Sequence, residues 1–212
     1  MPDWEQIFGE RGKVFTEPHK DMARIADLFR DKGVHRILDL GCGTGRHIVF
    51  LSKRGFEVYG FDASPRALSM TRQWLHEEGL EADLRLHRME NRFPYGDTFF
   101  DAIVSVQVIH HNLMKDILKT VREISRVLKP EGLVFITVST MTEYRSREDW
   151  ALELVEKDTY LPRAGPESGL VHHYFTEEEI RTVFSSFDIL EMYIDDTRHR
   201  CFLGVKRNRH GA

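Results

Sequence analysis

Runs rich in apolar and β-branched residues alternate with helical patterns along most of the chain, and this alternation restricts the possible folds more than any other feature. The runs predict seven strands, at residues 36–40, 57–61, 84–86, 101–108, 133–138, 187–194 and 201–206. A strand–helix–strand order favours a parallel sheet with helices on both faces. We therefore expect an α/β fold with a seven-stranded, mostly parallel sheet and an antiparallel strand pair at its C-terminal edge.

Two of the helices between the strands have recognisable ends in the sequence. Ser64 is a favourable N-cap, Pro65 suits the first helical position, and Gly79 suits the end of the same helix. Thr176 and Glu179 have the spacing of a capping box, which predicts the start of the last helix.

A single apolar stripe with a period of about 3.6 residues predicts a helix before the fifth strand. Its members are Ile117, Leu118, Val121, Ile124, Val127 and Leu128. We expect this helix to end at Pro130 and Gly132, because both residues interrupt helices. Weaker patterns predict helices at residues 18–29, at 44–53 and, inside a long connection, at 147–157.

Composition narrows the class of protein. The chain has 212 residues, of which 41% are hydrophobic and 30% charged, as is typical of a single globular domain. Its two cysteines cannot form a disulfide framework, so we expect a reducing compartment, the cytoplasm. A net charge of −4 provides no basic field for nucleic acid. The sequence also has neither a signal peptide at its start nor an apolar run long enough to span a membrane.

Glycines follow the first predicted strand directly, in the order Asp39-Leu40-Gly41-Cys42-Gly43-Thr44-Gly45. Glycine lets the backbone turn tightly and approach a ligand closely, and the helix that follows presents free N–H groups. Asp62 ends the second strand, 21 residues after Gly41, where a carboxylate can accept both hydroxyls of a ribose. These features predict a site for a cofactor that contains a nucleoside.

More than one class of nucleotide site uses glycines in this way. The dinucleotide fingerprint requires a third glycine at the position of Arg46, and the Gly-Lys-Ser/Thr sequence of a P-loop is absent. An NAD(P)-dependent oxidoreductase is therefore an alternative, although its glycine fingerprint is not matched at Arg46.

The glycine motif D-L-G-C-G-T-G resembles motif I of the class I methyltransferases that depend on S-adenosylmethionine (SAM). The resemblance covers residues 34–140, in the order and spacing of that family. It continues through V-Y-G-F-D-A-S-P from Val58, F-D-A-I-V-S from Phe100 and L-K-P-E-G from Leu128. It is nearest to the ubiquinone-biosynthesis and tellurite-resistance branches. The resemblance implies a Rossmann-like sheet, SAM as cofactor, S-adenosylhomocysteine as product and a small-molecule methyl acceptor.

The resemblance also implies roles for individual residues. Gly41 and Gly43 would contact the amino-acid end of SAM, Asp62 would accept the ribose hydroxyls, and Ala63 would lie along the adenosine. The family usually has an aspartate near the adenine at a position that falls on Arg88 or Met89. The rest of the expected cofactor set is Met89 and Glu90 beside the adenine, Arg46 near the methionine carboxylate, Cys42 in the loop and Val106 after the fourth strand. Arg46 has the alternative of a solvated helix start, and Cys42 that of a small packing residue.

Two histidine pairs are further candidates. His110 and His111 follow the fourth strand, where an acceptor would meet the methyl group, so either could remove a proton from an acceptor hydroxyl or amine. A role in packing is the alternative. His172 and His173 precede the last helix and could contact the ligand from a lid or pack against that helix. No carboxylate spacing supports a metal site, so we expect no metal.

We expect one methyltransferase domain over residues 1–212. Its parts would be an N-terminal cap (1–33), a SAM-binding core (34–140), a lid or substrate insertion (141–175) and a final helix with edge strands (176–212). The predicted activity is methyl transfer to a small molecule by in-line displacement, in a monomer or homodimer that binds neither nucleic acid nor membrane. The alternatives are the oxidoreductase above and a SAM-binding protein without turnover.

Overall fold

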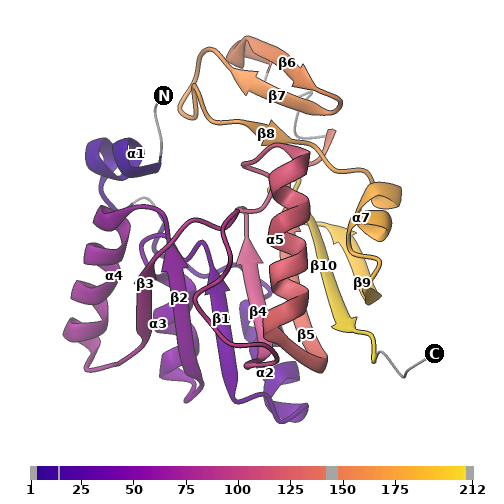
Figure 1. The fold of residues 1–212 in the computed structure, drawn as a ribbon. Helices are drawn as coiled ribbons and strands as arrows, with labels where there is room; N and C mark the ends of the chain where they lie inside the picture. The colour runs from indigo at the N-terminus through magenta and orange to yellow at the C-terminus, as the bar shows by residue number, and fades with distance from the viewer. Residues whose placement is uncertain (1–3, 14, 142–147, 209–212) are drawn as a thin grey trace.

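A seven-stranded sheet crosses the centre of the molecule in the order β3-β2-β1-β4-β5-β10-β9 (Figure 1). The computed structural model describes residues 4–13, 15–141 and 148–208. The strands are β1 Arg36–Leu40, β2 Glu57–Asp62, β3 Asp83–Leu86, β4 Phe100–Val106, β5 Leu128–Val138, β9 Phe187–Ile194 and β10 Arg200–Lys206. Strands β1 to β5 pair in parallel, whereas β10 and β9 add an antiparallel edge. The predicted fold class is therefore confirmed.

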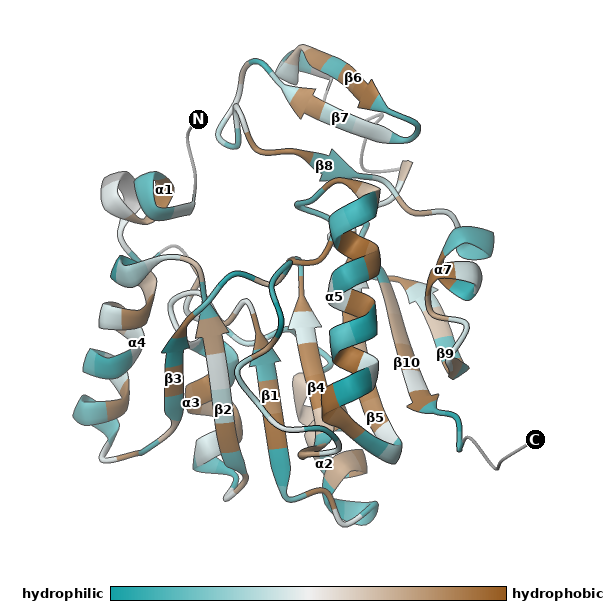
Figure 2. Ribbon diagram, in the orientation of Figure 1, coloured by the Kyte–Doolittle hydropathy of each residue, from teal (hydrophilic) through white to brown (hydrophobic). Residues whose placement is uncertain are grey.

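Helices cover both faces of this sheet. The helices of the described chain are α1 Trp4–Arg11, α2 Met22–Asp31, α3 Arg46–Lys53, α4 Pro65–Glu78, α5 Met114–Val127 and α7 Glu177–Val183. Apolar side chains of α5 and α7 pack with one face of the sheet, and those of α2, α3 and α4 pack with the other. Long apolar stretches run along the central strands, whereas apolar and polar residues alternate along α5 (Figure 2). None of the described helices has the length and apolarity needed to cross a lipid bilayer.

The predicted helix ends follow from local hydrogen bonds. The Ser64 hydroxyl accepts from the Ala67 N–H at 3.0 Å, and the Thr176 hydroxyl accepts from the Glu179 N–H at 3.1 Å. Gly79 closes α4 with a φ of 64°, a conformation that glycine adopts without strain. These three expectations are confirmed.

The end predicted for helix α5 was wrong. The helix stops at Val127, and Leu128 already has extended backbone angles and pairs with Phe100 in the sheet. Pro130 therefore lies in strand β5 rather than at the helix end. Leu118 is 37% exposed and does not belong to the buried stripe. Leu128 fits a helical period by spacing, but its buried place in the sheet decides its conformation.

The helix predicted for residues 147–157 was also wrong. Residue 147 lies outside the described residues, and from 148 the chain forms a short 3₁₀ turn, Glu148–Trp150, and then a three-stranded sheet. Its strands are β6 Leu152–Glu156, β7 Thr159–Pro162 and β8 His172–His173. The turn between β6 and β7 places Asp158 at a φ of 54°, which aspartate tolerates and which ends any helical pattern there.

This small sheet lies over the carboxyl ends of the parallel strands, on the same side of the molecule as α1 (Figure 1). Two backbone hydrogen bonds hold it there. The His173 N–H donates to the His110 carbonyl at 2.8 Å, and the Phe175 N–H donates to the Ser139 carbonyl at 3.0 Å. The small sheet thus covers the sheet end at which open α/β folds bind ligands.

Candidate functional site

A cavity of about 780 Å³ opens at the carboxyl ends of the parallel strands, between the main sheet, α1 and the segment that leads to β8. Its size falls within the range of about 300–1,000 Å³ that is usual for small-molecule sites. Every residue predicted for the site lines it: Gly41, Cys42, Gly43, Arg46, Asp62, Ala63, Met89, Glu90, Val106, His110 and His111. The structure therefore brings together residues from four separate loops.

The glycine loop, residues 41–45, forms part of the wall of this cavity. Gly41 has a φ of 71°, and a Cβ built on it would lie 2.4 Å from a methyl carbon of Val108. Gly45 has a φ of 92°, and a Cβ there would lie 2.6 Å from the Thr71 methyl group. Both positions therefore require glycine for two reasons, the positive φ and the lack of space. The loop ends at Arg46, where α3 begins.

Asp62 joins the glycine loop to the end of β2. One carboxylate oxygen accepts from the Gly43 N–H at 2.8 Å, and the other accepts from the Ser64 N–H at 2.9 Å. Burial raises the pKa of Asp62, although these backbone N–H groups act in the opposite direction. Two hydrogen bonds leave further lone pairs on the carboxylate, so it can also accept from a ligand.

A second carboxylate lies beneath the loop. Asp39 is 1% exposed, and its Oδ2 atom has no hydrogen-bond partner in the described part of the chain. Burial raises the pKa of Asp39 to about 7, and the Arg46 guanidinium only partly opposes this. Arg46 itself lies over the Phe15 ring, 5.0 Å from its centre. Asp39 was not among the predicted site residues, although it stands in the glycine motif.

Residues after β3 form the opposite wall. Met89 packs against the apolar core, and its carbonyl accepts from the Thr120 hydroxyl at 2.9 Å. Glu90 pairs with Arg88, and both line the cavity. His87, which the sequence did not single out, also lines the cavity, and its ring lies 5.4 Å from that of Phe61.

The N-terminal helix closes one side of the cavity. Trp4, Glu5 and Phe8 of α1 line it. Glu5 accepts from the Arg66 N–H at 3.0 Å and from the Ser64 hydroxyl, so it anchors α1 to the start of α4.

Three imidazoles meet beside the cavity, where His110 and His111 line it and the buried His172 packs against both. The ring centres of His110 and His111 lie 4.1 Å apart, and those of His111 and His172 lie 4.5 Å apart. One ring nitrogen from each of the three lies within 4.8 Å of the others. Trp4 packs edge-on against His111 at 5.1 Å. Three of the four predicted histidines, His110, His111 and His172, therefore meet, whereas His173 faces Glu179 and Thr159 instead.

His173 has other partners. Its Nε2 atom lies 2.9 Å from a Glu179 carboxylate oxygen, and its Nδ1 atom lies 2.7 Å from the Thr159 hydroxyl. These contacts tie β8 to β7 and to the start of α7, away from the cavity.

Several lining residues have no signal in the sequence. Glu167, Leu170 and Val171 reach the cavity from the segment before β8, and His199 reaches it from the turn before β10. They lie far along the chain from the glycine loop and from His111. Only the tertiary fold brings them to the site, so no spacing rule could have identified them.

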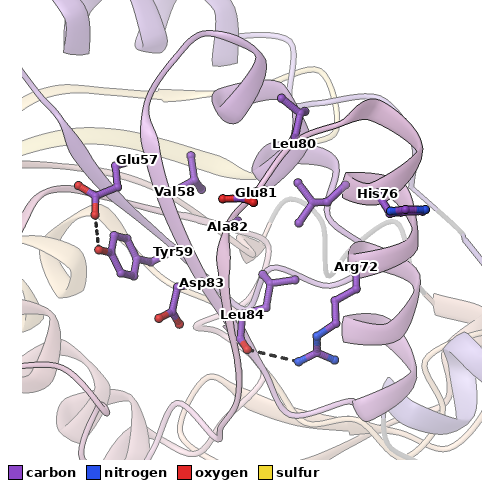
Figure 3. A pocket seen from close by; sticks show the side chains of 11 residues that line it. Glu57, Val58, Tyr59, Arg72, His76, Leu80, Glu81, Ala82, Asp83 and Leu84 are labelled. Carbon is purple, nitrogen blue, oxygen red and sulfur yellow. Dashed lines mark hydrogen bonds between the residues drawn. The ribbon is translucent and has the colours of Figure 1, made fainter.

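A second cavity of about 700 Å³ lies between α4, the edge strand β3 and its neighbour β2 (Figure 3). Glu57 and Asp83, the first residues of these strands, help to line it, and Arg72 donates to the Leu84 carbonyl at 3.3 Å. None of the predicted site residues lines it. Since ligands of open α/β sheets bind beyond the carboxyl ends of the strands, the first cavity is the better candidate.

Comparison with known proteins finds methyltransferases among the relatives of this chain. Residues 38–136 match the family model described as a methyltransferase domain. The chain is 31% identical over 120 residues to the uncharacterized methyltransferase YcgJ of Bacillus subtilis (57% of this chain, 46% of that protein). It is 32% identical over 102 residues to the ubiquinone biosynthesis O-methyltransferase of Azoarcus sp. (48% and 43%). The chain thus spans about half the length of the curated relatives that it matches.

The fold has close relatives among solved structures. The PH0226 protein from Pyrococcus horikoshii superposes with a TM-score of 0.74 at 17% identity, covering 93% of this chain and 99% of that one. At 17% identity, this match supports the fold and carries no conclusion about function. The family model covers the glycine loop, Asp62 and the strands that carry them. Together with the curated relatives, this match shows that residues 38–136 are similar to the methyltransferase domain of the class I SAM-dependent methyltransferases.

Proposed function

We propose that this protein transfers the methyl group of SAM to a small-molecule acceptor. One observation carries the proposal: the glycine loop and the Asp62 carboxylate form one wall of a single cavity that also reaches His111. The family match favours SAM over the dinucleotide alternative, as does Arg46 at the position of the missing third glycine.

The residues present suit SAM. The loop at Gly41 and Gly43 brings backbone close to the ligand, and Asp62 has acceptor capacity for the ribose hydroxyls. Arg46, next to the buried Asp39, offers a cation to the methionine carboxylate. Ala63 and Met89 offer apolar surface to the adenosine, and Glu90 offers an acceptor. Cys42, which is 5% exposed and faces the core beside Gly60, serves packing.

The chain's part in the reaction is alignment, exclusion of water and removal of one proton. SAM, when bound, supplies a methyl group on a cationic sulfur, which leaves as the neutral sulfur of S-adenosylhomocysteine. We assign the base to His111, because it is partly exposed in the cavity. His110 is 2% exposed, and its Nδ1 atom accepts from the Ser139 N–H at 3.3 Å, so it supports the loop.

Apolar side chains form part of the cavity wall on the acceptor side. Trp4 packs against His111, and Val108, Leu113 and Leu170 line the same cavity. Among the described lining residues, Arg46 and Arg88 are the arginines, and none is a lysine. A small apolar or aromatic acceptor fits such walls better than a polynucleotide does, and the net charge of −4 agrees. The relatives' names, which include an O-methyltransferase of ubiquinone biosynthesis, support a small molecule.

We also propose the organisation predicted from the sequence. Residues 1–33 act as a cap, 34–140 as the SAM-binding core, 141–175 as a lid and 176–212 as the closing helix and strands. The cavity walls from α1 and from residues 167–171 support the cap and lid assignments. Two cysteines that are both buried and unpaired support a reducing, cytoplasmic location. A monomer or homodimer remains the expected assembly.

A transfer assay tests this function. The protein is incubated with SAM labelled in the methyl group and a panel of small alcohols, phenols, thiols and amines. Label in an organic product together with an equal amount of S-adenosylhomocysteine is the expected result. If SAM binds but no acceptor in a broad panel takes up label, the chain is a SAM-binding protein without turnover.

A further inference from the structure

The segment from Glu167 to His172 is held in shape by its last residue. The Nδ1 atom of His172 lies 2.9 Å from the Leu170 carbonyl oxygen, and its Nε2 atom lies 2.6 Å from a Glu167 carboxylate oxygen. A carbonyl only accepts, so Nδ1 donates, and one further proton lies between Nε2 and the carboxylate. Since the His172 side chain is fully buried, both bonds are shielded from water. We call residues 167–172 the pinned loop.

The pinned loop sets the position of one carbonyl group. Val171 stands between Leu170 and His172, which are hydrogen-bonded to each other. The carbonyl oxygen of Val171 lies 3.3 Å from Nδ1 of His111. Because this oxygen can only accept, Nδ1 of His111 carries the hydrogen. A neutral imidazole has one protonated nitrogen, so the lone pair of His111 is on Nε2.

We infer that the Glu167–His172 pair is a positioning device, which holds the Val171 carbonyl against His111 and so selects the tautomer with its lone pair on Nε2. The acceptor is then a molecule whose methylated atom carries a proton: an alcohol, a phenol, a thiol or an N–H group. This inference rests on the proposed function, because His111 acts as a base only if methyl transfer takes place in this cavity.

The step balances without a further reactant. A lone pair of the acceptor oxygen, sulfur or nitrogen forms the new bond to the methyl carbon. The carbon–sulfur bond breaks, and its electron pair stays on sulfur. The proton of the acceptor atom passes to Nε2 of His111, which becomes an imidazolium. Solvent water at the open side of the cavity then accepts that proton.

The three imidazoles also have a spacing that a transition metal could use, with nitrogens within 4.8 Å of one another. The hydrogen bonds favour the proton role. Nδ1 of His110 accepts from the Ser139 N–H, so the proton of neutral His110 is on Nε2. Both nitrogens of His172 are engaged by Leu170 and Glu167. A metal would have to displace two of these contacts.

Charged and titratable groups surround His111 on several elements. The rings of His110 and His172 contact His111, and Glu5 on α1, Asp116 on α5, Glu167 of the pinned loop and His199 before β10 line the same cavity. Tautomers are therefore compared at one pH, about 8, where an ordinary histidine is neutral.

Nitrogen NMR of protein with ¹⁵N-labelled histidine tests the tautomer directly, with the His111→Gln variant used to assign the signal. We expect a protonated Nδ1 and an unprotonated Nε2 for His111 in the unaltered protein. Glu167→Ala and His172→Phe should allow both tautomers. Glu167→Gln should preserve the native one, because its amide can donate to Nε2 of His172. An Nε2–H tautomer in the unaltered protein, or no change in both disrupting variants, overturns the inference.

The chain provides a matched control. Glu179 pairs with His173 at 2.9 Å, one residue along β8, but this pair lies away from the cavity. Glu179→Ala should therefore leave the His111 signal unchanged. SAM titrations on the same samples distinguish failure of the proposed function from failure of the inferred tautomer. If the unaltered protein does not bind SAM, the proposed function is refuted, whereas the tautomer of His111 is still decided by the NMR signals.

Three further measurements can overturn the inference. Once an acceptor has been identified, Glu167→Ala should lower kcat by about 10- to 100-fold without changing the KM for SAM. This loss is a part of the rate enhancement that a general base contributes. A product methylated on a tertiary amine or a thioether would contradict the acceptor class. One equivalent of tightly held transition metal, lost in His172→Phe, would replace the proton role with a metal role.

Discussion

The backbone N–H of Gly43 donates to the Asp62 carboxylate at 2.8 Å, which fastens the glycine loop after β1 to the end of β2. The two motifs that mark the cofactor site in the sequence are therefore one hydrogen-bonded unit in the fold. The same carboxylate accepts from the Ser64 N–H at the start of α4. It shapes the loop whether or not a ligand is bound, and its remaining acceptor capacity faces the cavity.

The first prediction concerns this carboxylate. Asp62→Ala should weaken SAM binding by roughly 1.5–3 kcal/mol, or about 10- to 150-fold in Kd, as expected for losing hydrogen bonds to a charged group. Calorimetric titration measures the change. Asp83→Ala is the control, because Asp83 begins the neighbouring strand β3 and lines only the second cavity. Equal affinity of the Asp62 variant and the unaltered protein would refute the ribose assignment.

The second prediction concerns Gly41. Gly41→Ala should lower the free energy of unfolding by about 1–3 kcal/mol and weaken SAM binding, because the new Cβ would lie 2.4 Å from Val108 and because φ is 71°. Adding Val108→Ala should restore part of the loss, since it removes the clash but not the positive φ. Urea unfolding of both single variants and the double variant gives the coupling energy. Strict additivity would show that the two side chains do not meet.

The third prediction concerns the buried Asp39. Burial raises its pKa in the folded protein to about 7, well above the ordinary value near 3.9. The folded state therefore binds more protons than the unfolded state between about pH 4 and pH 7, so this group lowers the free energy of unfolding as the pH rises through that window. The full effect is at most about 4 kcal/mol.

Asp39→Asn removes this titration. We expect the variant to lose less stability than the unaltered protein when the pH is raised from about 5 to about 8, as measured by urea unfolding at both values. Asp83→Asn, on the edge strand β3, should leave the pH dependence unchanged. Parallel pH dependences for Asp39→Asn and the unaltered protein would mean that Asp39 is ionised throughout.

The fourth prediction concerns Asp195, which ties the N-terminal segment to the C-terminal hairpin. Its carboxylate accepts from His19 Nε2 at 3.0 Å and from the His199 and Thr197 N–H groups, each at 2.9 Å. Burial alone would raise the pKa of Asp195, but these bonds outweigh it and hold the pKa well below its usual range. The stability that Asp195 contributes is therefore present above about pH 4 and lost as the solution becomes more acidic.

Asp195→Asn should lower the free energy of unfolding at pH 7 by about 2–4 kcal/mol, because the amide cannot accept all of these bonds. The neighbouring Asp196 is a matched control, since its side chain is 71% exposed and pairs with Lys20, which is itself 48% exposed. Asp196→Asn should change stability by less than about 0.5 kcal/mol. Similar losses in the two variants would contradict a structural role for Asp195.

The parts of the fold that could be predicted are those specified locally. The cap at Ser64, the end of α4 at Gly79 and the capping box at Thr176 each depend on residues within a few positions of one another. Strand β4, Phe100–Val106, is mostly apolar and is buried at every position except Asp101, as expected of a central parallel strand. Periodicity and turn chemistry were sufficient for these elements.

The parts that could not be predicted depend on tertiary partners. Leu152–Glu156 is composed of leucine, valine and glutamate, which fit a helix, and it forms a strand because it pairs with β7. Leu128 continues a helical spacing but is recruited into the sheet opposite Phe100. The same holds for the site, where Glu167 and Val171 act on His111 from a segment more than fifty positions away.

The central claim is that the glycine-loop cavity binds SAM, and calorimetric titration with SAM, S-adenosylhomocysteine and NAD tests it most directly. We predict that the first two bind with one site per chain, that NAD does not, and that Asp62→Ala weakens both. Thermal unfolding on the same samples should show the matching stabilisation, about 2.7 kcal/mol at a ligand concentration of 100 times Kd. Binding of NAD without SAM, or SAM binding that is indifferent to Asp62→Ala, would contradict the claim.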